Sequence, residues 1–137
     1  MGIRFDKSLS FKHQISYLNK TCVNRLNFLK IVSKRKYGLK NSTLEQLYRS
    51  LIRSILEYSS IIFPTLSDSN LYKLNVIQNK SLKIINKKSV YTSMNKITTD
   101  IESLNTRADK LNRKYFENAF RNNNILIKDL CQEFIDM

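Results

Sequence analysis

The 137-residue sequence contains few residues that interrupt a chain, cross-link it or bind metals. It has 2 Gly, 1 Pro, 2 Cys, 1 His and no Trp. So few turn-forming residues predict long helices joined by few tight turns. Cys22 and Cys131 are far apart in the sequence and His13 is the only histidine, so no metal-ligand spacing points to a zinc site. Cys22 falls on an apolar face, where we expect a buried thiol.

No apolar run is long enough to cross a bilayer. The longest, from Leu51 to Phe63, is interrupted by Arg53 and Glu57. It is well short of the roughly 20 apolar residues that a membrane-spanning helix needs. The N-terminus has no charged, apolar and cleavage regions typical of a secretory signal. We therefore expect an intracellular protein with no membrane partner.

Catalytic constellations are also missing. Asp100 and Glu102 form an acidic pair in a polar stretch, without a third carboxylate nearby in the sequence. Polymerases and nucleases that use two metals need clustered carboxylates to hold them. The sequence has no Gly-rich phosphate loop and no Ser/His/Asp or Cys/His arrangement supported by its context. We expect this chain alone not to be an enzyme and to bind no cofactor.

Positive charge is what the sequence has in excess. The 24 basic and 11 acidic side chains give a net charge of +13. Such an excess favours a polyanionic partner, most simply nucleic acid or an acidic membrane surface. An ordinary solvated face, with lysine enriched by AT-rich codons, is the alternative explanation.

The strongest helical periodicity lies between residues 42 and 62. Ser42 and Glu45 have the spacing of a capping box at its start, and Pro64 is expected to end it. Arg53 falls off the apolar face on a regular helical wheel. We predict a central helix here, whose apolar face consists of Leu44, Leu47, Tyr48, Leu51, Ile52, Ile55, Leu56, Ser59 and Ile62.

Apolar spacing and turn signals divide the rest of the chain. In order, they predict a short strand over residues 2–5, a helix over 10–33, a basic loop over 34–40, a helix over 70–86 capped by Ser67 or Ser69, a Ser/Thr/Asn-rich loop over 87–103, and helices over 105–122 and 125–135. The predicted fold class is all-α, with four to five helices packed around the central helix and a short N-terminal strand remnant.

Basic side chains gather in three places, two of them opposite apolar faces that must turn inward. We expect them to contact phosphates, which gives affinity without reading bases. Interleaved tyrosines fit base stacking, but at helical spacing a core position is the commoner role. The candidate nucleic-acid-binding residues are Lys34, Arg35, Lys36 and Lys40 in the basic loop, Lys73, Lys80, Lys83 and Lys87 on one helix, and Arg107, Lys110, Lys114 and Arg121 on another.

An ordered set of short segments resembles one region of a known family. The segments are G-I-R-F-D-K-S-L-S-F-K (2–12), R-L-N-F-L-K (25–30), Y-G (37–38), L-Y-R-S-L-I-R-S-I-L-E-Y-S-S (47–60), S-N-L-Y-K-L (69–74) and I-Q-N-K-S-L-K-I-I (77–85). They resemble the region just downstream of the catalytic palm in reverse transcriptases (RNA-directed DNA polymerases) of jockey-like non-LTR retrotransposons. The resemblance covers residues 2–86 and, more weakly, 104–120.

The resemblance implies a single thumb-like helical domain over residues 1–137. Its parts would be a strand remnant of a missing palm (1–9), a three-helix core (10–86), a loop (87–103) and a C-terminal helical extension (104–137). It implies a non-catalytic fragment that grips RNA–DNA or other template–primer duplex without sequence preference. An upstream palm-and-fingers polypeptide would be a further partner, and the nucleus the location. A helical protein-interaction module and a decayed mobile-element remnant without function are the alternatives.

Overall fold

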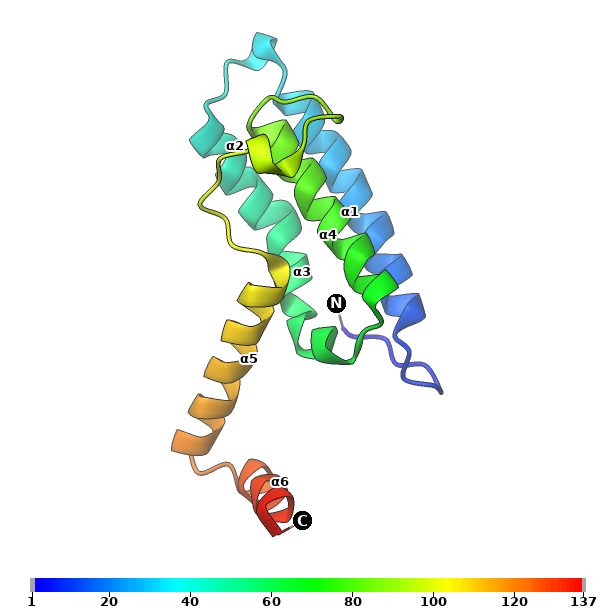
Figure 1. The fold of residues 1–137 in the computed structure, drawn as a ribbon, viewed down its shortest axis with the longest axis vertical. Helices are drawn as coiled ribbons and strands as arrows, with labels where there is room; N and C mark the ends of the chain where they lie inside the picture. The colour runs from blue at the N-terminus through cyan, green and yellow to red at the C-terminus, as the bar shows by residue number, and fades with distance from the viewer. Residues whose placement is uncertain (1, 137) are drawn as a thin grey trace.

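The computed structural model describes residues 2–136, apart from the side chain of Phe134, and this range contains helices but no strand (Figure 1). The predicted all-α fold class is confirmed. Because α2, η2 and α3 follow one another without a break, the α-helices form five rods. The helical segments are α1 (Lys12–Val32), η1 (Arg35–Tyr37), α2 (Asn41–Tyr48), η2 (Arg49–Arg53), α3 (Ser54–Tyr58), η3 (Ser60–Thr65), α4 (Asp68–Ile85), η4 (Met94–Lys96), α5 (Leu104–Arg121) and α6 (Ile125–Asp136).

The core lies between α1, α4 and the rod formed by α2, η2 and α3. In Figure 1, α1 and α4 run in the same direction and the rod runs against them. Leucine and isoleucine side chains from all three are fully buried, and each contributes about 1.5–3 kcal/mol by leaving water. Cys22 is buried among them, as predicted, and burial raises the pKa of its thiol to about 11.

The central helix is not a regular α-helix. Its middle, η2, is π-helical, and its end, η3, is a 3-10 segment that contains Pro64. A π-helical turn takes more residues than an α-helical one, so the side chains along it shift around the helix axis. Leu51 is consequently only half-buried, whereas Arg53 is 3% exposed. The predicted position of Arg53 off the buried face was wrong for this reason, whereas Leu51 still packs against the core from its edge.

Arg53 is buried because its guanidinium finds partners inside. Its Nε donates to Glu57 Oε1 at 2.9 Å, and its Nη1 donates to the carbonyl oxygen of Glu102 at 2.8 Å. Arg107 of α5 donates to the same Glu57 oxygen at 3.1 Å. A buried charge is tolerable when it is paired and hydrogen-bonded in this way. The network joins the central rod to the start of α5.

Two of the predicted helix-end signals have different outcomes. The capping box was wrong: α2 already begins at Asn41, no side chain caps it, and Glu45 pairs with Arg49 at 2.8 Å instead. The cap at Ser67 is confirmed, because its Oγ accepts a hydrogen bond from the Asn70 amide at 3.4 Å. An i,i+4 ion pair on an exposed face competes with the reach back to the helix start.

Residues 2–11 form an irregular segment rather than the predicted strand. The amide of Arg4 donates to Oε1 of Gln14, a side chain that is 1% exposed, at 3.0 Å. Ile3 packs against the core, and the Arg4 guanidinium lies 4.8 Å from the centre of the Tyr17 ring. The segment therefore finds its partners on α1 instead of on a sheet, which corrects the strand remnant expected over residues 1–9 (Met1 lies outside the described residues).

The C-terminal third departs from the compact part. Residues 86–103 are mostly irregular, as predicted, with η4 as a single turn. Ser103 caps α5 by accepting from the Thr106 amide at 3.2 Å. The first half of α5 packs beside α3 and η3, and its second half extends away and carries α6 at its tip (Figure 1).

Candidate nucleic-acid interface

A groove of about 620 Å³ runs between the C-terminal halves of α1 and α4. This volume lies within the range of binding clefts, roughly 300–1,000 Å³. Seven of its lining side chains are cationic, and none is acidic or aromatic. The groove is lined by Val23, Leu26, Asn27, Lys30, Ser33, Lys34, Arg35, Lys80, Lys83, Ile84, Lys87, Lys88 and Val90.

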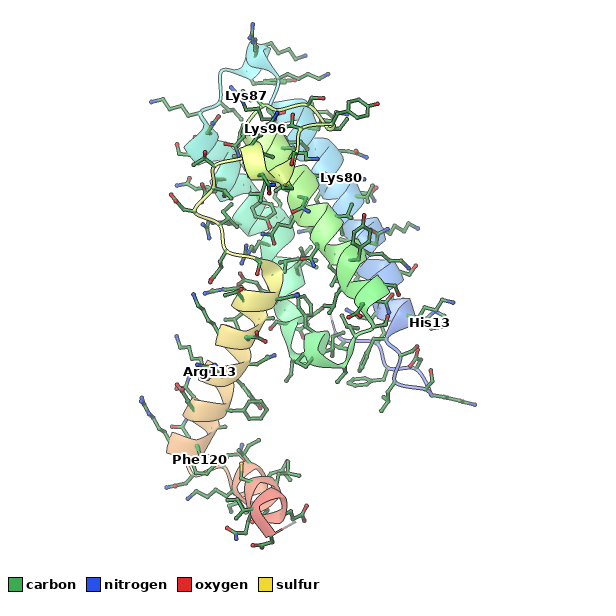
Figure 2. All side chains as sticks on the ribbon, viewed as in Figure 1. His13, Lys80, Lys87, Lys96, Arg113 and Phe120 are labelled. Carbon is green, nitrogen blue, oxygen red and sulfur yellow. The ribbon has the colours of Figure 1, made fainter. Side chains whose placement is uncertain are left out.

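The parallel arrangement of α1 and α4 explains why these cations meet. Both helices end at the same end of the molecule, where Figure 2 labels Lys87. Basic residues are favoured in a last helical turn because they complement the negative end of the helix dipole. Lys30 and Lys83 occupy such turns, and the segments that follow the two helices add further cations. Two separate sequence regions thus form one positive surface.

The lysines after α4 form a Schellman motif. The amide of Lys88 donates to the carbonyl oxygen of Lys83 at 2.8 Å, and the amide of Lys87 donates to that of Ile84 at 3.0 Å. Lys87 has a φ of 53°, in the left-handed region that this motif usually fills with glycine. A side chain in that region costs roughly 1–2 kcal/mol. The fold thus accepts strain at a position that adds a cation to the groove.

Replacing Lys87 with glycine is expected to stabilise the fold and weaken anion binding together. The free energy of unfolding should rise by about 1 kcal/mol because the strained Cβ is removed. The exposed hydrogen bond from Lys87 Nζ to the Leu39 carbonyl, at 3.3 Å, offsets little of this gain. Urea melts and duplex titrations measure both effects, with Lys88→Ala as a control that removes a cation without relieving strain. A less stable chain with unchanged affinity would contradict this role for Lys87.

The basic stripe predicted on α5 divides into two parts. Arg107 bonds to Glu57, and Lys110 Nζ lies 2.6 Å from Glu102 Oε2. The Lys110 hydrogen bond lowers the pKa of Glu102, which keeps that carboxylate charged. These two cations are neutralised and anchor α5 to the rest of the fold. Lys114 and Arg121 lie further along α5, exposed and outside the groove.

Other predicted site residues are separated in the same way. Lys34, Arg35, Lys80, Lys83 and Lys87 come together in the groove. Lys73 is exposed nearer the start of α4, outside the lining. Lys36 lies over the ring of its neighbour Tyr37, with Nζ 4.9 Å from the ring centre, and Lys40 precedes α2.

Two groove residues, Lys30 and Lys88, were not among the predicted site residues. Lys30 lies on the first helix, which contributed none of the predicted site residues, and Lys88 is one residue beyond Lys87. Both lysines lie at or just after a helix C-terminus. This position predicts a shared site only when the two helices are known to end side by side.

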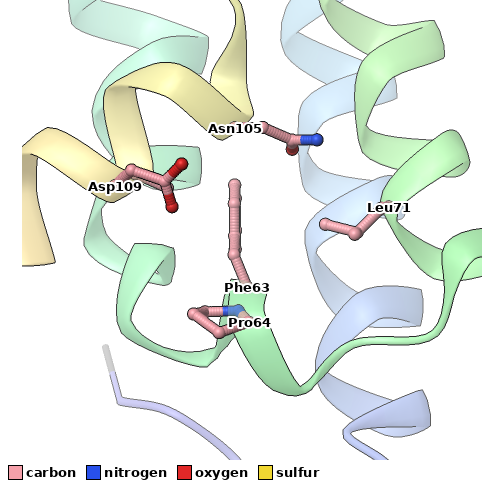
Figure 3. A pocket seen from close by; sticks show the side chains of 6 residues that line it. Phe63, Pro64, Leu71, Asn105 and Asp109 are labelled. Atoms are coloured by element: carbon pink, nitrogen blue, oxygen red, sulfur yellow. The ribbon is translucent and has the colours of Figure 1, made fainter.

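A second cavity, of about 200 Å³, lies between η3, α4 and α5 (Figure 3). It is lined by Phe63, Pro64, Leu71, Ala108, Asn105 and Asp109. None of these lining side chains is basic, and the cavity is smaller than the usual range of ligand pockets, roughly 300–1,000 Å³. This cavity therefore does not extend the basic surface.

Within residues 2–136, no three His, Cys, Asp or Glu side chains come together to hold a metal ion. Nor does this range contain a helix with the length and apolar character needed to cross a bilayer. Comparisons with protein-family models, curated proteins and solved structures found no match to the chain. The groove must therefore be interpreted from its own geometry and charge.

Proposed function

We propose that this chain is a non-catalytic module that binds the phosphate backbone of duplex nucleic acid along the groove between α1 and α4. The proposal rests on the composition of the groove, whose lining includes seven cationic side chains and no carboxylate. Each helix C-terminus carries about half a negative charge. Seven unit charges outweigh the two helix ends, so the groove attracts a polyanion.

The composition of the groove favours backbone contacts over base reading. Proteins that hold single strands stack bases on aromatic side chains, and the groove lining contains none. Lysines on flexible stems act as point charges toward phosphates and carry no sequence information. Leu26 and Ile84 add apolar side chains to the lining, and six of the seven cations are exposed and accessible to phosphates. Sequence-independent binding of a duplex fits this arrangement.

The resemblance to the thumb of non-LTR reverse transcriptases supports an RNA–DNA hybrid as the duplex. A chain of that kind would bind a template–primer while a separate palm-and-fingers polypeptide performs the chemistry, in the nucleus if it follows such elements. Polymerisation by this chain alone is not proposed, since no carboxylate cluster for two metals occurs within residues 2–136.

Titration of a fluorescent RNA–DNA hybrid at several salt concentrations tests this function. If four to six phosphates are neutralised, log K should fall against log salt with a slope of about −4 to −5. Micromolar or weaker affinity is expected at physiological salt, as for non-specific binding. A protein with no affinity for the hybrid even at low salt would refute the proposal.

A second candidate function, a protein-interaction module, is supported by a different surface of the molecule. Large apolar side chains stay exposed on the second half of α5 and on α6, away from the groove. The two surfaces do not overlap, so one does not exclude the other.

A further inference from the structure

Two exposed tyrosines lie beside the groove, at the end where α1 and α4 terminate. Tyr37 belongs to η1, which follows α1, and Tyr91 belongs to the irregular segment that follows α4. Figure 1 shows both segments at the same end of the molecule. Arg35 and Val90, which line the groove, precede these tyrosines by two residues and by one residue. Aromatic rings thus adjoin a groove whose own lining has none.

Lysines of the groove connect α4 to both tyrosine-bearing segments. Lys83 Nζ donates to the carbonyl oxygen of Val90 at 2.8 Å, and the next residue along the chain is the exposed tyrosine of that segment. Lys87 Nζ donates to the carbonyl oxygen of Leu39 at 3.3 Å, two residues beyond Tyr37. The same lysines that add charge to the groove therefore hold the two segments next to it.

Neither ring is used up by the packing of the fold. Tyr91 is 94% exposed, so its ring contributes almost nothing to the core, and Tyr37 is 48% exposed. Among the described side chains, no other aromatic ring stacks on either of them. Lys36 Nζ lies 4.9 Å from the centre of the Tyr37 ring, which puts a cation for a phosphate beside that ring. An exposed ring next to a cation is the combination that single-stranded nucleic acid binds.

Unpaired bases are the groups that such rings can contact. The faces of paired bases are covered by neighbouring pairs, so a ring beside a duplex meets a base face where the strands stop pairing. An aromatic side chain stacks on any unpaired base, because every base has a π-face. One such contact raises affinity by roughly fivefold to 150-fold. Tyrosines at the end of a groove that binds phosphates therefore favour a duplex that continues as a single strand.

We propose that the chain binds most tightly to a duplex that ends in a single-stranded tail, whose unpaired bases stack on Tyr37 and Tyr91. The basic side chains of the groove hold the phosphates of the paired part. The tyrosines add affinity that requires unpaired bases without reading their identity. This inference rests on the proposed function, because the tyrosines distinguish among nucleic acids that the groove already binds.

Three RNA–DNA hybrids with the same paired length test this inference on the full chain at one salt concentration. The first is blunt, the second has a short single-stranded tail, and the third has a tail of equal length made of abasic nucleotides. The abasic tail carries the same phosphates without bases, so it separates stacking from charge. The hybrid with bases in its tail should bind at least roughly fivefold more tightly than the abasic one.

The outcomes separate this inference from the function on which it rests. Equal affinity for the two tailed hybrids, with the blunt hybrid still bound, would overturn the role of the tyrosines and leave the duplex groove standing. No affinity for any of the three hybrids would overturn both proposals.

Substitutions assign the preference to the two rings. Tyr37→Ala with Tyr91→Ala should abolish the preference for the tail with bases and leave affinity for the blunt hybrid within about twofold, because the phosphate contacts are unchanged. Tyr37→Phe with Tyr91→Phe should retain the preference, because phenylalanine keeps the aromatic face. Tyr72→Ala is the matched control, since Tyr72 is 69% exposed near the start of α4 and outside the groove lining. A preference that survives the double alanine substitution, or is lost equally in the control, would contradict the proposal.

Discussion

Reversing Lys34, Lys80 and Lys88 to glutamate is expected to lower affinity for an RNA–DNA hybrid by about a hundredfold or more. These three exposed side chains line the groove on both of its walls. A loss of about 1 kcal/mol for each phosphate contact removed gives this factor, before the added repulsion is counted. The fold should stay intact, because their side chains do not contribute to the buried core. Fluorescence anisotropy at physiological salt measures the affinity.

The matched control reverses Lys12, Lys20 and Lys73, exposed side chains of the same two helices outside the groove. It changes the net charge by the same amount. Lys20 lies about 15 Å along α1 from Lys30, beyond the roughly 8 Å over which exposed charges interact at physiological salt. Affinity should therefore stay within about threefold of the wild-type value at that salt. Equal losses in the two variants would mean that net charge, and not the groove, determines binding.

Replacing Leu56 with alanine is expected to destabilise the fold strongly. Leu56 is 0% exposed, and truncating a fully buried leucine costs about 2–5 kcal/mol. The same change at the half-buried Leu51 should cost about 1 kcal/mol, because less apolar area returns to water. Urea melts of both variants measure the free energies of unfolding.

The pair tests the difference in burial between the two leucines. Leu51 and Leu56 lie about 140° apart on a regular α-helical wheel, and the structure buries Leu56 fully and Leu51 only in part, so similar losses at the two positions would contradict the observed packing. A loss at Leu56 several times larger than that at Leu51 supports it. Far-UV circular dichroism before melting verifies that both variants start from the same helix content.

The predicted helices follow from apolar spacing, and this signal was accurate for α1, α4, α5 and α6. Their ends agree with the predictions to within a few residues. The register within η2 is different, because a π-helical turn is stabilised by contacts made after folding. The partners of Arg53 include the carbonyl oxygen of Glu102, 49 positions away in the sequence. No local pattern contains that bond, so a regular wheel put Arg53 in solvent.

The N-terminal segment illustrates a second limit of local patterns. Alternation over residues 2–5 predicts a strand, but a strand needs a neighbouring strand to form its hydrogen bonds. Here the Arg4 amide finds a side-chain acceptor on Gln14, and Phe5 packs edge-on against Phe11 with ring centres 5.6 Å apart. Side-chain contacts with α1 thus replaced a sheet, and alternation alone does not distinguish the two outcomes.

The candidate site was harder to predict from the sequence than the fold, because it depends on which helices lie side by side. The basic stripe on α4 was visible in the sequence, since Lys80, Lys83 and Lys87 share one side of the helix. The contribution of Lys30 to the facing wall of the groove was not visible, because Lys30 lies at least 50 positions away in the sequence. The stripe on α5 was equally visible, but Arg107 and Lys110 are neutralised by carboxylates of other elements. Periodicity places a charge on a face without revealing what that face contacts.

The slope of log K against log salt, compared between the two charge-reversed chains, is the most direct test of the proposed interface. Each phosphate contact contributes about 0.9 to that slope, so the groove variant should lose roughly three units and fall to about −1 to −2. The variant with Lys12, Lys20 and Lys73 reversed should keep the wild-type slope of about −4 to −5. Indistinguishable slopes in the two variants would show that the groove between α1 and α4 does not hold the duplex.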